Sequence, residues 1–447
     1  SSDYLNNTSV DPVTNRLKFT ISLWVKRSTL GAKSMIGTVG GDSSNFGAIW
    51  FDSSDRLNCT EGSGGGTLNF ITNRVFRDVS AWYNIILAID TTQGTESNRV
   101  KIYVNGVQET SFSTSTYPGQ NSNMHLNRGG KTQYIGRHTD SSNNYYFDGY
   151  MTEVVWVDGQ QLSNTDLGEF DEDSGIWKPI DVSGLTFGTN GFYLDFEDSS
   201  ALGNDAAGSN NFTVNNLTAI DQSTDTCTNN SAVLNNLIYG ANYSFSEGNL
   251  QFAQSASNWD TTYSSIGVTK GKWYMEYKGK VGAYHDIGVT DVITPTTNPS
   301  VSTGGVAWKS NSEFAQGGNV GGGLPSNVTS PASNTYTADD IIGIALDVDN
   351  EAVYFAKNGV WEVNSDPTSG ASKTGAVTLP NSNSTYFFAF AAYKGSAASG
   401  TGQVNFGGGS VDAISSGNTD GNGYGNMEFE IPSGYYVLNT KNLAEYG

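Results

Sequence analysis

Cysteine and histidine are both scarce in this chain of 447 residues, which has two cysteines and three histidines. No Cys-x-x-Cys pair and no Cys/His spacing typical of zinc occurs, so Cys59 and Cys227 indicate neither a zinc site nor a disulfide framework. A serine or cysteine nucleophile needs a histidine partner, and His125, His138 and His285 lie in no nucleophile context such as Gly-x-Ser-x-Gly. The scarcity disfavours zinc enzymes and triad hydrolases.

Positive charge and long apolar runs are scarce as well. Lys and Arg number 23 against 44 Asp and Glu, which gives a formal net charge of −21. Such a surface repels phosphate backbones and anionic lipid, so we expect no nucleic-acid partner and no membrane insertion. No apolar run reaches the length of a membrane span, and the start SSDYLNNTSV lacks the basic and apolar regions of a signal peptide.

Glycine and aromatic residues, by contrast, are abundant. The chain has 54 glycines and 12% aromatic residues, while charged residues make up only 15%. Turn-rich strands around an aromatic core fit this balance better than helical bundles, which need many Glu, Lys, Leu and Ala. The composition therefore predicts an all-β protein.

A short pattern occurs twice, at residues 85–107 (IILAIDTTQGTESNRVKIYVNGV) and 341–361 (IIGIALDVDNEAVYFAKNGVW). In each copy an apolar strand ends in an aspartate, Asp90 or Asp347. A polar turn, an alternating strand and then Asn-Gly follow. Asn-Gly takes positive φ at both central positions of a type I′ turn, the preferred two-residue hairpin connection. The repeat predicts two all-β domains of related architecture.

Residues 1–162 hold many short strands separated by Gly, Asn, Asp and Ser turns, which is typical of a β-sandwich or jelly roll. In LKFTISLWVKR the apolar Phe19, Ile21 and Trp24 have polar neighbours, which predicts a half-buried strand. The order of FTISLWVKR, AWYNIILAID, RVKIYVNGV, YIGR and YFDGYMTEVVWVDGQQL resembles the concanavalin A-like fold in its laminin-G/pentraxin form.

Residues 163–235 are mostly polar around one strand-like piece, GFYLDFED. We expect a connector packed on the domains rather than a free linker, because Trp177 and Phe192 would be poorly placed in solvent. In residues 236–447 the strands GKWYMEYKGK, HDIGVTDV and DDIIGIALDVDNEAVYFAKNGVW resemble a SPRY (B30.2) domain, itself a concanavalin A-like sandwich.

The combination of a laminin-G-like module, the connector and a SPRY-like module ending in GYYVLNTKNL resembles a family of structural proteins of tailed phages, common in marine phages. The resemblance implies a fibre, tail or virion-surface protein without enzymatic activity, located on the virion. Its partners would be other virion proteins and a host-surface glycan or protein. Particle symmetry implies a homo-oligomer such as a trimer.

Paired carboxylates for glycoside hydrolysis need alternate positions on one strand. The sequence EFDEDSG (169–175) lacks the flanking apolar strand and the final Glu of such a pattern. FYLDFED places Asp195 and Glu197 on one face of a predicted strand, which a solvated edge explains equally well. A polysaccharide depolymerase or glycosidase on this fold therefore stays an alternative function.

The laminin-G/pentraxin resemblance implies one possible cofactor, calcium, bound at a rim of the sandwich by aspartate side chains and backbone carbonyls. The candidates are Asp90 at the end of its strand, Asp140 in HTDSSNN and Asp148 in YFDGY. Asp148 followed by glycine is also a good turn, and no contiguous Asp-x-Asp-x-Asp run occurs.

Sugar-binding surfaces use exposed aromatic rings as stacking platforms beside amide and carboxylate groups. Tyr145 and Tyr146 in SSNNYYFDG fit, because neighbouring residues of a strand face opposite ways and one ring should be exposed. Tyr117 in an expected loop and Trp361 after the second Asn-Gly are further candidates, and core packing is the alternative for each. Glycan or receptor binding on a phage particle is the expected function. A secreted cellular adhesin is a further alternative, which would require an export signal.

Overall fold

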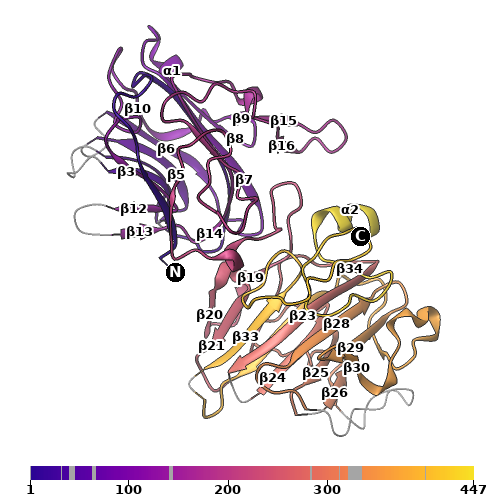
Figure 1. Cartoon of the computed structure of the whole chain (residues 1–447). Coiled ribbons are helices and arrows are strands. Elements are labelled where there is room, and N and C mark those ends of the chain that lie inside the picture. The colour runs from indigo at the N-terminus through magenta and orange to yellow at the C-terminus, as the bar shows by residue number, and fades with distance from the viewer. Residues whose placement is uncertain are drawn as a thin grey trace. The chain divides into compact units, whose positions relative to one another are not determined.

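The computed structural model describes residues 2–31, 33–39, 46–62, 67–139, 144–281, 284–311, 313–320, 335–397 and 399–447. The chain divides into two compact units, Ser1–Gln222 and Ser223–Gly447. Each unit is built from antiparallel sheets, which confirms the predicted all-β sandwich class (Figure 1). The division falls within residues 163–235, the segment expected to be the connector.

Unit 1 contains an eight-stranded sheet and a six-stranded sheet. The strand order in the first is β10 (Phe112–Thr116), β6 (Leu68–Val75), β5 (Arg56–Glu61), β4 (Phe46–Phe51), β3 (Lys33–Val39), β11 (Thr132–Ile135), β1 (Tyr4–Thr8) and β18 (Thr213–Asn215). The order in the second is β17 (Phe192–Leu194), β14 (Gly149–Asp158), β2 (Lys18–Arg27), β7 (Trp82–Asp90), β8 (Val100–Val104) and β9 (Val107–Gln108).

The core of unit 1 lies between these two sheets. Alternate residues of β2 and β7 point into it, and they meet apolar side chains of β4, β5 and β6. The members of this core on those five strands are Phe19, Ile21, Leu23, Val25, Ile85, Leu87, Ile89, Ile49, Phe51, Leu57, Cys59, Leu68 and Phe70. The period-2 alternation of these strands thus builds the sandwich.

A second apolar layer covers the outer face of the six-stranded sheet. Ile86, Tyr103 and Val155 face outward and pack against Leu167 and Val182, which come from the segment after β14. Leu167 and Val182 belong to the start of the expected connector, residues 163–235, and this part of it packs on the sheet.

The burial of β2 corrects one prediction. β2 is buried on both faces rather than half-buried, since Trp24, which faces away from Ile21, is only 3% exposed.

Unit 2 contains a seven-stranded and a nine-stranded sheet. The first runs β19 (Leu234–Tyr239), β22 (Asp260–Ser264), β32 (Phe387–Tyr393), β24 (Tyr284–Thr290), β25 (Gly305–Lys309), β26 (Glu313–Gln316) and β27 (Asn319–Val320). The second runs β20 (Tyr243–Ser246), β21 (Gln251–Gln254), β33 (Gly400–Asn405), β23 (Lys272–Val281), β28 (Ile341–Asp347), β29 (Ala352–Lys357) and β30 (Val360–Trp361). β31 (Val377–Thr378) pairs with β29, and β34 (Tyr436–Val437) with β23.

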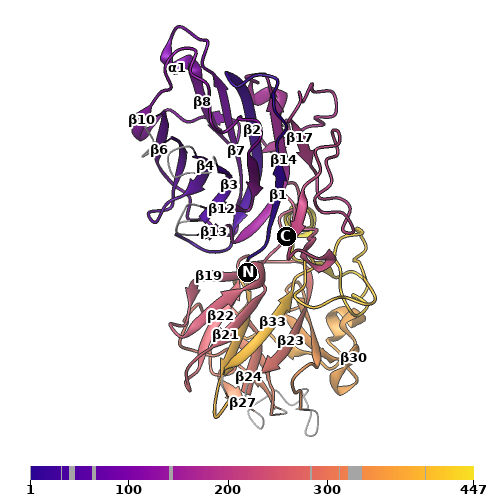
Figure 2. The same cartoon turned by 60° about the vertical axis from the view of Figure 1, so that its left-hand side comes forward.

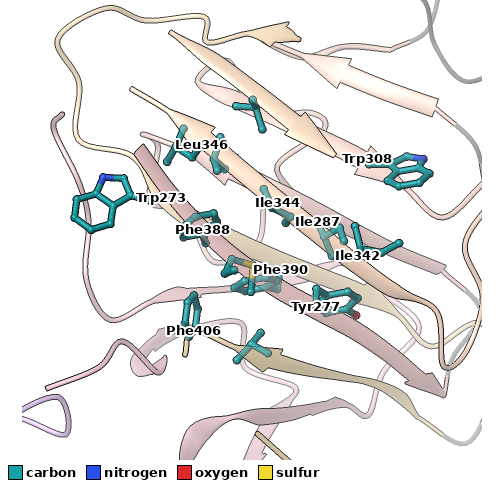
Figure 3. Packing of buried hydrophobic residues seen from close by; sticks show 14 of the residues in the cluster. Trp273, Tyr277, Ile287, Trp308, Ile342, Ile344, Leu346, Phe388, Phe390 and Phe406 are labelled. Atoms are coloured by element: carbon teal, nitrogen blue, oxygen red, sulfur yellow. The ribbon is translucent and has the colours of Figure 1, made fainter. Parts of the chain in front are cut away.

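Aromatic residues dominate the core between these sheets. Figure 3 shows Trp273 and Trp308 at opposite ends of the cluster, with Phe388 and Phe390 between them. Trp273 and Trp308 are both 0% exposed. The core of unit 2 is thus the aromatic interior that the composition indicates.

Short elements complete both units. In unit 1 these are α1 (Glu96–Arg99) and two hairpins, β12 (Arg137–Thr139) with β13 (Asn144–Tyr146) and β15 (Gly168–Phe170) with β16 (Trp177–Pro179); in unit 2, α2 (Thr440–Tyr446) follows β34. Both cysteines are free. Among the described helices none is long and apolar enough to cross a membrane.

Candidate ligand-binding site

The outer face of the eight-stranded sheet carries two tyrosines where β1 pairs with β11. Leu5 of β1 stands opposite Ile135 of β11, and both point into the core, being 2% and 3% exposed. Because successive strand residues face opposite ways, Tyr4 and Tyr134 lie on the outer face. Their ring centroids are 6.0 Å apart, and both side chains are half-buried.

Amide side chains flank the two rings on the same face. Asn6 stands opposite Tyr134, and Asn215 of β18 stands opposite Tyr4. The Asn215 Nδ2 donates to Asn6 Oδ1 at 2.7 Å, and both residues are half-buried. Aromatic faces and amides therefore alternate across three neighbouring strands, a combination that can stack on sugar rings and bond to hydroxyl groups.

The β12–β13 hairpin packs against β3 beside this face (Figure 2). It can do so because β3 has a glycine at the contact: a Cβ on Gly37 would lie 2.8 Å from His138 Nδ1. Tyr145, opposite His138 on the hairpin, stacks on the imidazole with centroids 6.3 Å apart, and Phe46 lies 5.6 Å from His138 on another side. Tyr145 is 37% exposed.

The other face of the hairpin carries Arg137 and Tyr146, which stand opposite each other. The Arg137 guanidinium lies 4.6 Å from the ring centroid of Tyr4, 5.1 Å from that of Tyr134 and 5.7 Å from that of Tyr146. It also donates from Nη2 to Asn144 Oδ1 at 2.7 Å. We call Tyr4, Tyr134, Arg137 and Tyr146 the tyrosine–arginine cluster.

The predicted tyrosine pair is therefore divided between two surfaces. Tyr146 joins the tyrosine–arginine cluster, while Tyr145 is the more exposed ring and lies on the opposite face of the hairpin with His138. The strand alternation predicts this division.

The other two predicted aromatic residues lie elsewhere and pack on apolar layers. Tyr117 follows β10, at the far edge of the sheet from β1, and meets Phe70 edge-on with centroids 4.8 Å apart. Trp361 belongs to unit 2, where its ring lies 6.4 Å from that of Tyr274. Both are half-buried against core clusters, so packing accounts for their positions.

The predicted calcium ligands are not brought together. Asp90 stands opposite Lys18 at one end of β2, whereas Asp148 precedes Gly149, which stands opposite Arg27 at the other end. β2 has ten residues, so these two ends lie about 30 Å apart. Asp140 lies outside the described residues.

The two described aspartates already have protein partners. The Asp90 carboxylate accepts from Thr92 N, Thr92 Oγ1 and Gln93 Nε2 and pairs with Lys18 at 3.1 Å. Burial raises the pKa of Asp90, but these hydrogen bonds outweigh burial and hold the pKa below its usual range. The Asp148 carboxylate accepts from Thr29 Oγ1 at 2.6 Å. In the part of the chain that the structure describes, no group of three or more His, Cys, Asp or Glu side chains could hold a metal ion.

The prediction that Asp195 and Glu197 lie on one face of a strand is wrong. β17 ends at Leu194, and the chain turns at Phe196 with φ 60° between Asp195 and Glu197. A different carboxylate, Glu153, is held nearby at a β-bulge in β14. Tyr193 Oη donates to Glu153 Oε2 at 2.6 Å.

Electrostatics at Glu153 favour its neutral form. Burial raises the pKa of Glu153, the hydrogen bond from Tyr193 opposes the rise, and the charges of Asp195 and Glu197 add to it. A half-buried acid with a raised pKa keeps its proton to a higher pH than an ordinary carboxyl does.

Sequence reasoning missed three members of the tyrosine–arginine cluster, Tyr4, Tyr134 and Arg137. The one available signal is alternation: in YLNNT and TQYI the residues next to the inward-facing Leu5 and Ile135 must face outward. Nothing local to either strand indicates that β1 and β11 are neighbours, so the meeting of the two rings could not be read from the sequence.

The sequence of residues 1–166 matches the model of the family described as the concanavalin A-like lectin/glucanases superfamily. This match confirms the concanavalin A-like interpretation of the first region. No curated protein matches the chain.

Three solved structures show distant likeness. The SPRY domain of human HERC1 is 13% identical, over 37% of this chain and 92% of that domain, with a TM-score of 0.27. A putative carbohydrate binding protein from Bacteroides ovatus is 18% identical, over 49% of this chain and 57% of its own, with a TM-score of 0.34. A pentraxin from Limulus polyphemus is 12% identical, over 48% and 85%, with a TM-score of 0.29. At these TM-scores the likenesses do not bear on the function of this chain, and the SPRY-like interpretation of the second region stays a prediction.

Proposed function

We propose that this protein is a non-enzymatic glycan-binding protein of a phage particle surface, and that the tyrosine–arginine cluster of unit 1 is its binding site. The observation that carries the site is the convergence of three half-buried tyrosine rings on one guanidinium at an outer sheet face. The match of residues 1–166 to a lectin/glucanase superfamily supports the glycan as ligand class.

The cluster has the chemistry that sugar binding requires. Tyrosine faces stack on the apolar faces of pyranose rings, and phenol, amide and guanidinium groups bond to hydroxyls. Asn144 and Asn6, which border the cluster, add amides on both sides. Each such contact contributes about 1 kcal/mol, so a single site is weak.

Particle display would compensate for weak single sites. Many copies on one virion turn a weak contact into a firm one, since the second binding event is intramolecular. This logic favours a homo-oligomer such as a trimer, set beside other virion proteins on a tail or head fibre. Gold-labelled antibody against the chain should decorate the outer surface of intact particles. Labelling only after particle disruption would contradict the proposed location.

The site is tested by two neighbouring substitutions on the hairpin. Retention of the full chain on a panel of immobilised host-surface glycans should fall about fivefold for Tyr146→Ala, because one stacking ring is lost. Tyr145→Ala is the matched control, since it removes a ring of equal size from the opposite face and should leave retention unchanged. Loss of retention with Tyr145→Ala alone would place the ligand against His138 and overturn the assigned site. No retention of the wild type on any glycan would overturn the function.

A hydrolase is the second candidate, and Glu153 is the observation that favours it. Its raised pKa suits a general acid, and Asp195 and Glu197 supply nearby carboxylates. If this candidate holds, the full chain releases reducing ends from bound polysaccharide, and Glu153→Gln abolishes the release while retention stays. Absence of reducing ends with every retained glycan would eliminate it.

A further inference from the structure

Arg137 differs from four other arginines of unit 1, whose charges each meet a carboxylate. Arg27 and Arg77 both pair with Asp55, Arg56 pairs with Asp52, and Arg74 pairs with Glu109. Among the described residues Arg137 forms no ion pair. Its guanidinium is surrounded by ring faces and has one side-chain acceptor, Asn144 Oδ1.

The hydrogen-bonding capacity of Arg137 is accordingly underused. A guanidinium has five N–H donors. Nη2 reaches Asn144, while Nε is shielded from solvent and has no hydrogen-bond partner among the residues that the structure describes. The side chain as a whole is half-buried, so part of it reaches solvent. The surrounding rings lower the local dielectric, which strengthens any ion pair made there.

The rings also fix the direction of the guanidinium. Contacts with Tyr4, Tyr134 and Tyr146 place it among the rings of β1, β11 and β13. A planar, immobilised fork loses little entropy on binding and matches the two oxygens of a carboxylate, or two oxygens of a sulfate ester. A neutral sugar hydroxyl would leave most of that capacity unused.

From this we infer that the ligand of the tyrosine–arginine cluster is an acidic saccharide, whose anionic group pairs with Arg137 while its sugar ring stacks on the tyrosines. The inference rests on the proposed glycan binding and adds the ligand's charge. The protein has a formal net charge of −21, so its surface as a whole repels polyanions. Binding of an acidic polysaccharide would therefore have to come from a specific contact such as the one with Arg137.

The test compares retention of the full chain on three polysaccharides: a polyuronate, a sulfated dextran and unmodified dextran. The polyuronate, the sulfated dextran or both should retain the wild type, and unmodified dextran should not. Retention on the polyuronate alone would identify a carboxylate as the anionic group, and retention on the sulfated dextran alone would identify a sulfate ester. Free glucuronate, with sodium chloride as the ionic-strength control, should compete from the polyuronate, and free glucose should not.

Variants separate the ionic contact from folding. Arg137→Gln should weaken retention at least about tenfold, and Arg137→Lys should keep part of it, because the charge stays and the fork is lost. Arg77→Gln is the matched control: it removes the same charge from the same unit, and Asp55 keeps Arg27 and Gly31 N as partners. Thermal melting of each variant shows whether the unit is folded.

Two outcomes overturn the inference in different ways. Retention on neutral dextran that depends on Tyr146 but is equal for wild type and Arg137→Gln would leave the glycan function standing and remove the acidic ligand. Equal weakening of retention by Arg77→Gln and Arg137→Gln would show a general charge effect and remove the assigned contact. Lack of retention on all three supports and on the wider glycan panel would remove both proposals.

Discussion

The two units share one hairpin module and use the rest of their chains differently. In unit 1 Lys18 of β2 stands opposite Asp90 of β7 and pairs with it at 3.1 Å. In unit 2 Lys272 of β23 stands opposite Asp347 of β28 and pairs with it at 2.9 Å. Each aspartate also accepts hydrogen bonds from the turn that follows it. The repeated aspartates Asp90 and Asp347 thus have a structural role: each joins the end of its strand to the neighbouring strand and to the turn that follows.

The Asn-Gly turns match as closely as the ion pairs. Asn105 and Gly106 have φ of 48° and 76°, and Asn358 and Gly359 have φ of 47° and 79°. Each glycine lies under an aromatic ring from an outer segment: a Cβ would come within 2.2 Å of Trp177 at Gly106 and within 2.6 Å of Phe429 at Gly359. The predicted type I′ hairpins are confirmed, and glycine is needed there for both its φ and its size.

The units differ on the face of the other sheet. In unit 1 the eight-stranded sheet presents the half-buried Tyr4 and Tyr134, and the β12–β13 hairpin adds Arg137. In unit 2 the seven-stranded sheet presents Asp286, which is 0% exposed and accepts from Asn298 and Ser300 of the segment between β24 and β25. The repeated hairpin module thus forms the same part of the sandwich in both units. The tyrosine–arginine cluster is built from strands of unit 1 that lie outside this module.

The largest expected effect on stability comes from removing the aromatic ring that covers each Asn-Gly turn, Trp177 in unit 1 and Phe429 in unit 2. Trp177 is 4% exposed and its Nε1 donates to Asn84 Oδ1 at 3.0 Å, whereas Phe429 is half-buried. Trp177→Ala should lower the free energy of unfolding of unit 1 by about 3–5 kcal/mol. Phe429→Ala should lower that of unit 2 by about 1–2 kcal/mol. Urea unfolding followed by tryptophan fluorescence measures both, and equal losses would contradict the difference in packing.

A smaller effect concerns the buried acid of unit 2. Burial raises the pKa of Asp286 to about 6, and hydrogen bonds from Ser300 and Asn298 oppose the rise. Because the folded pKa lies above the ordinary value near 3.8, this group stabilises the unit below about pH 4 and loses that contribution as pH rises through 6. Asp286→Asn should remove this dependence, which amounts to up to about 3 kcal/mol.

The neighbouring His285 acts in the opposite direction and must be separated from Asp286. Burial lowers the pKa of His285 to about 4, so its contribution is present above pH 6.5 and lost as pH falls through 4. The quantity to measure is therefore the difference in free energy of unfolding between wild type and Asp286→Asn at pH 4.5, 6 and 7.5. A difference that stays constant across these values would show that Asp286 keeps an ordinary pKa.

The fold was largely predictable because its determinants are local. Asn-Gly, the strand-ending aspartates and the period-2 alternation each act within a few residues, and they define the two hairpin modules. The cover on the outer face of the six-stranded sheet was not predictable, because Ile86 and Val155 pack against Leu167 and Val182, which come from a segment that follows later in the chain.

Only one of the four residues of the candidate site was predictable, for the same physical reason. Tyr146 was found because Tyr-Tyr in a strand must expose one ring. Its partners Tyr4 and Tyr134 come from strands more than a hundred residues apart whose pairing is a property of the sheet order. The predicted calcium ligands Asp90 and Asp148 lie far apart because they are next to opposite ends of β2.

The smallest effect compares the two turn asparagines. Asn105 Oδ1 accepts from Asn84 N in a partly buried position, while Asn358 Oδ1 accepts from Ile341 N in an exposed one. Alanine at either position loses this bond and must take positive φ, but water can replace the bond only at the exposed turn. Asn105→Ala should cost about 1–2 kcal/mol and Asn358→Ala about 1 kcal/mol or less in free energy of unfolding. Since glycine tolerates positive φ, Asn105→Gly isolates the bond from Asn84 N, whereas Asn358→Gly removes the bond from Ile341 N together with the exposed bond from Asn358 Nδ2 to Asp340 Oδ1. If both glycine variants lose the same stability, solvent does not distinguish the two turns, and the two modules are energetically as well as geometrically equivalent.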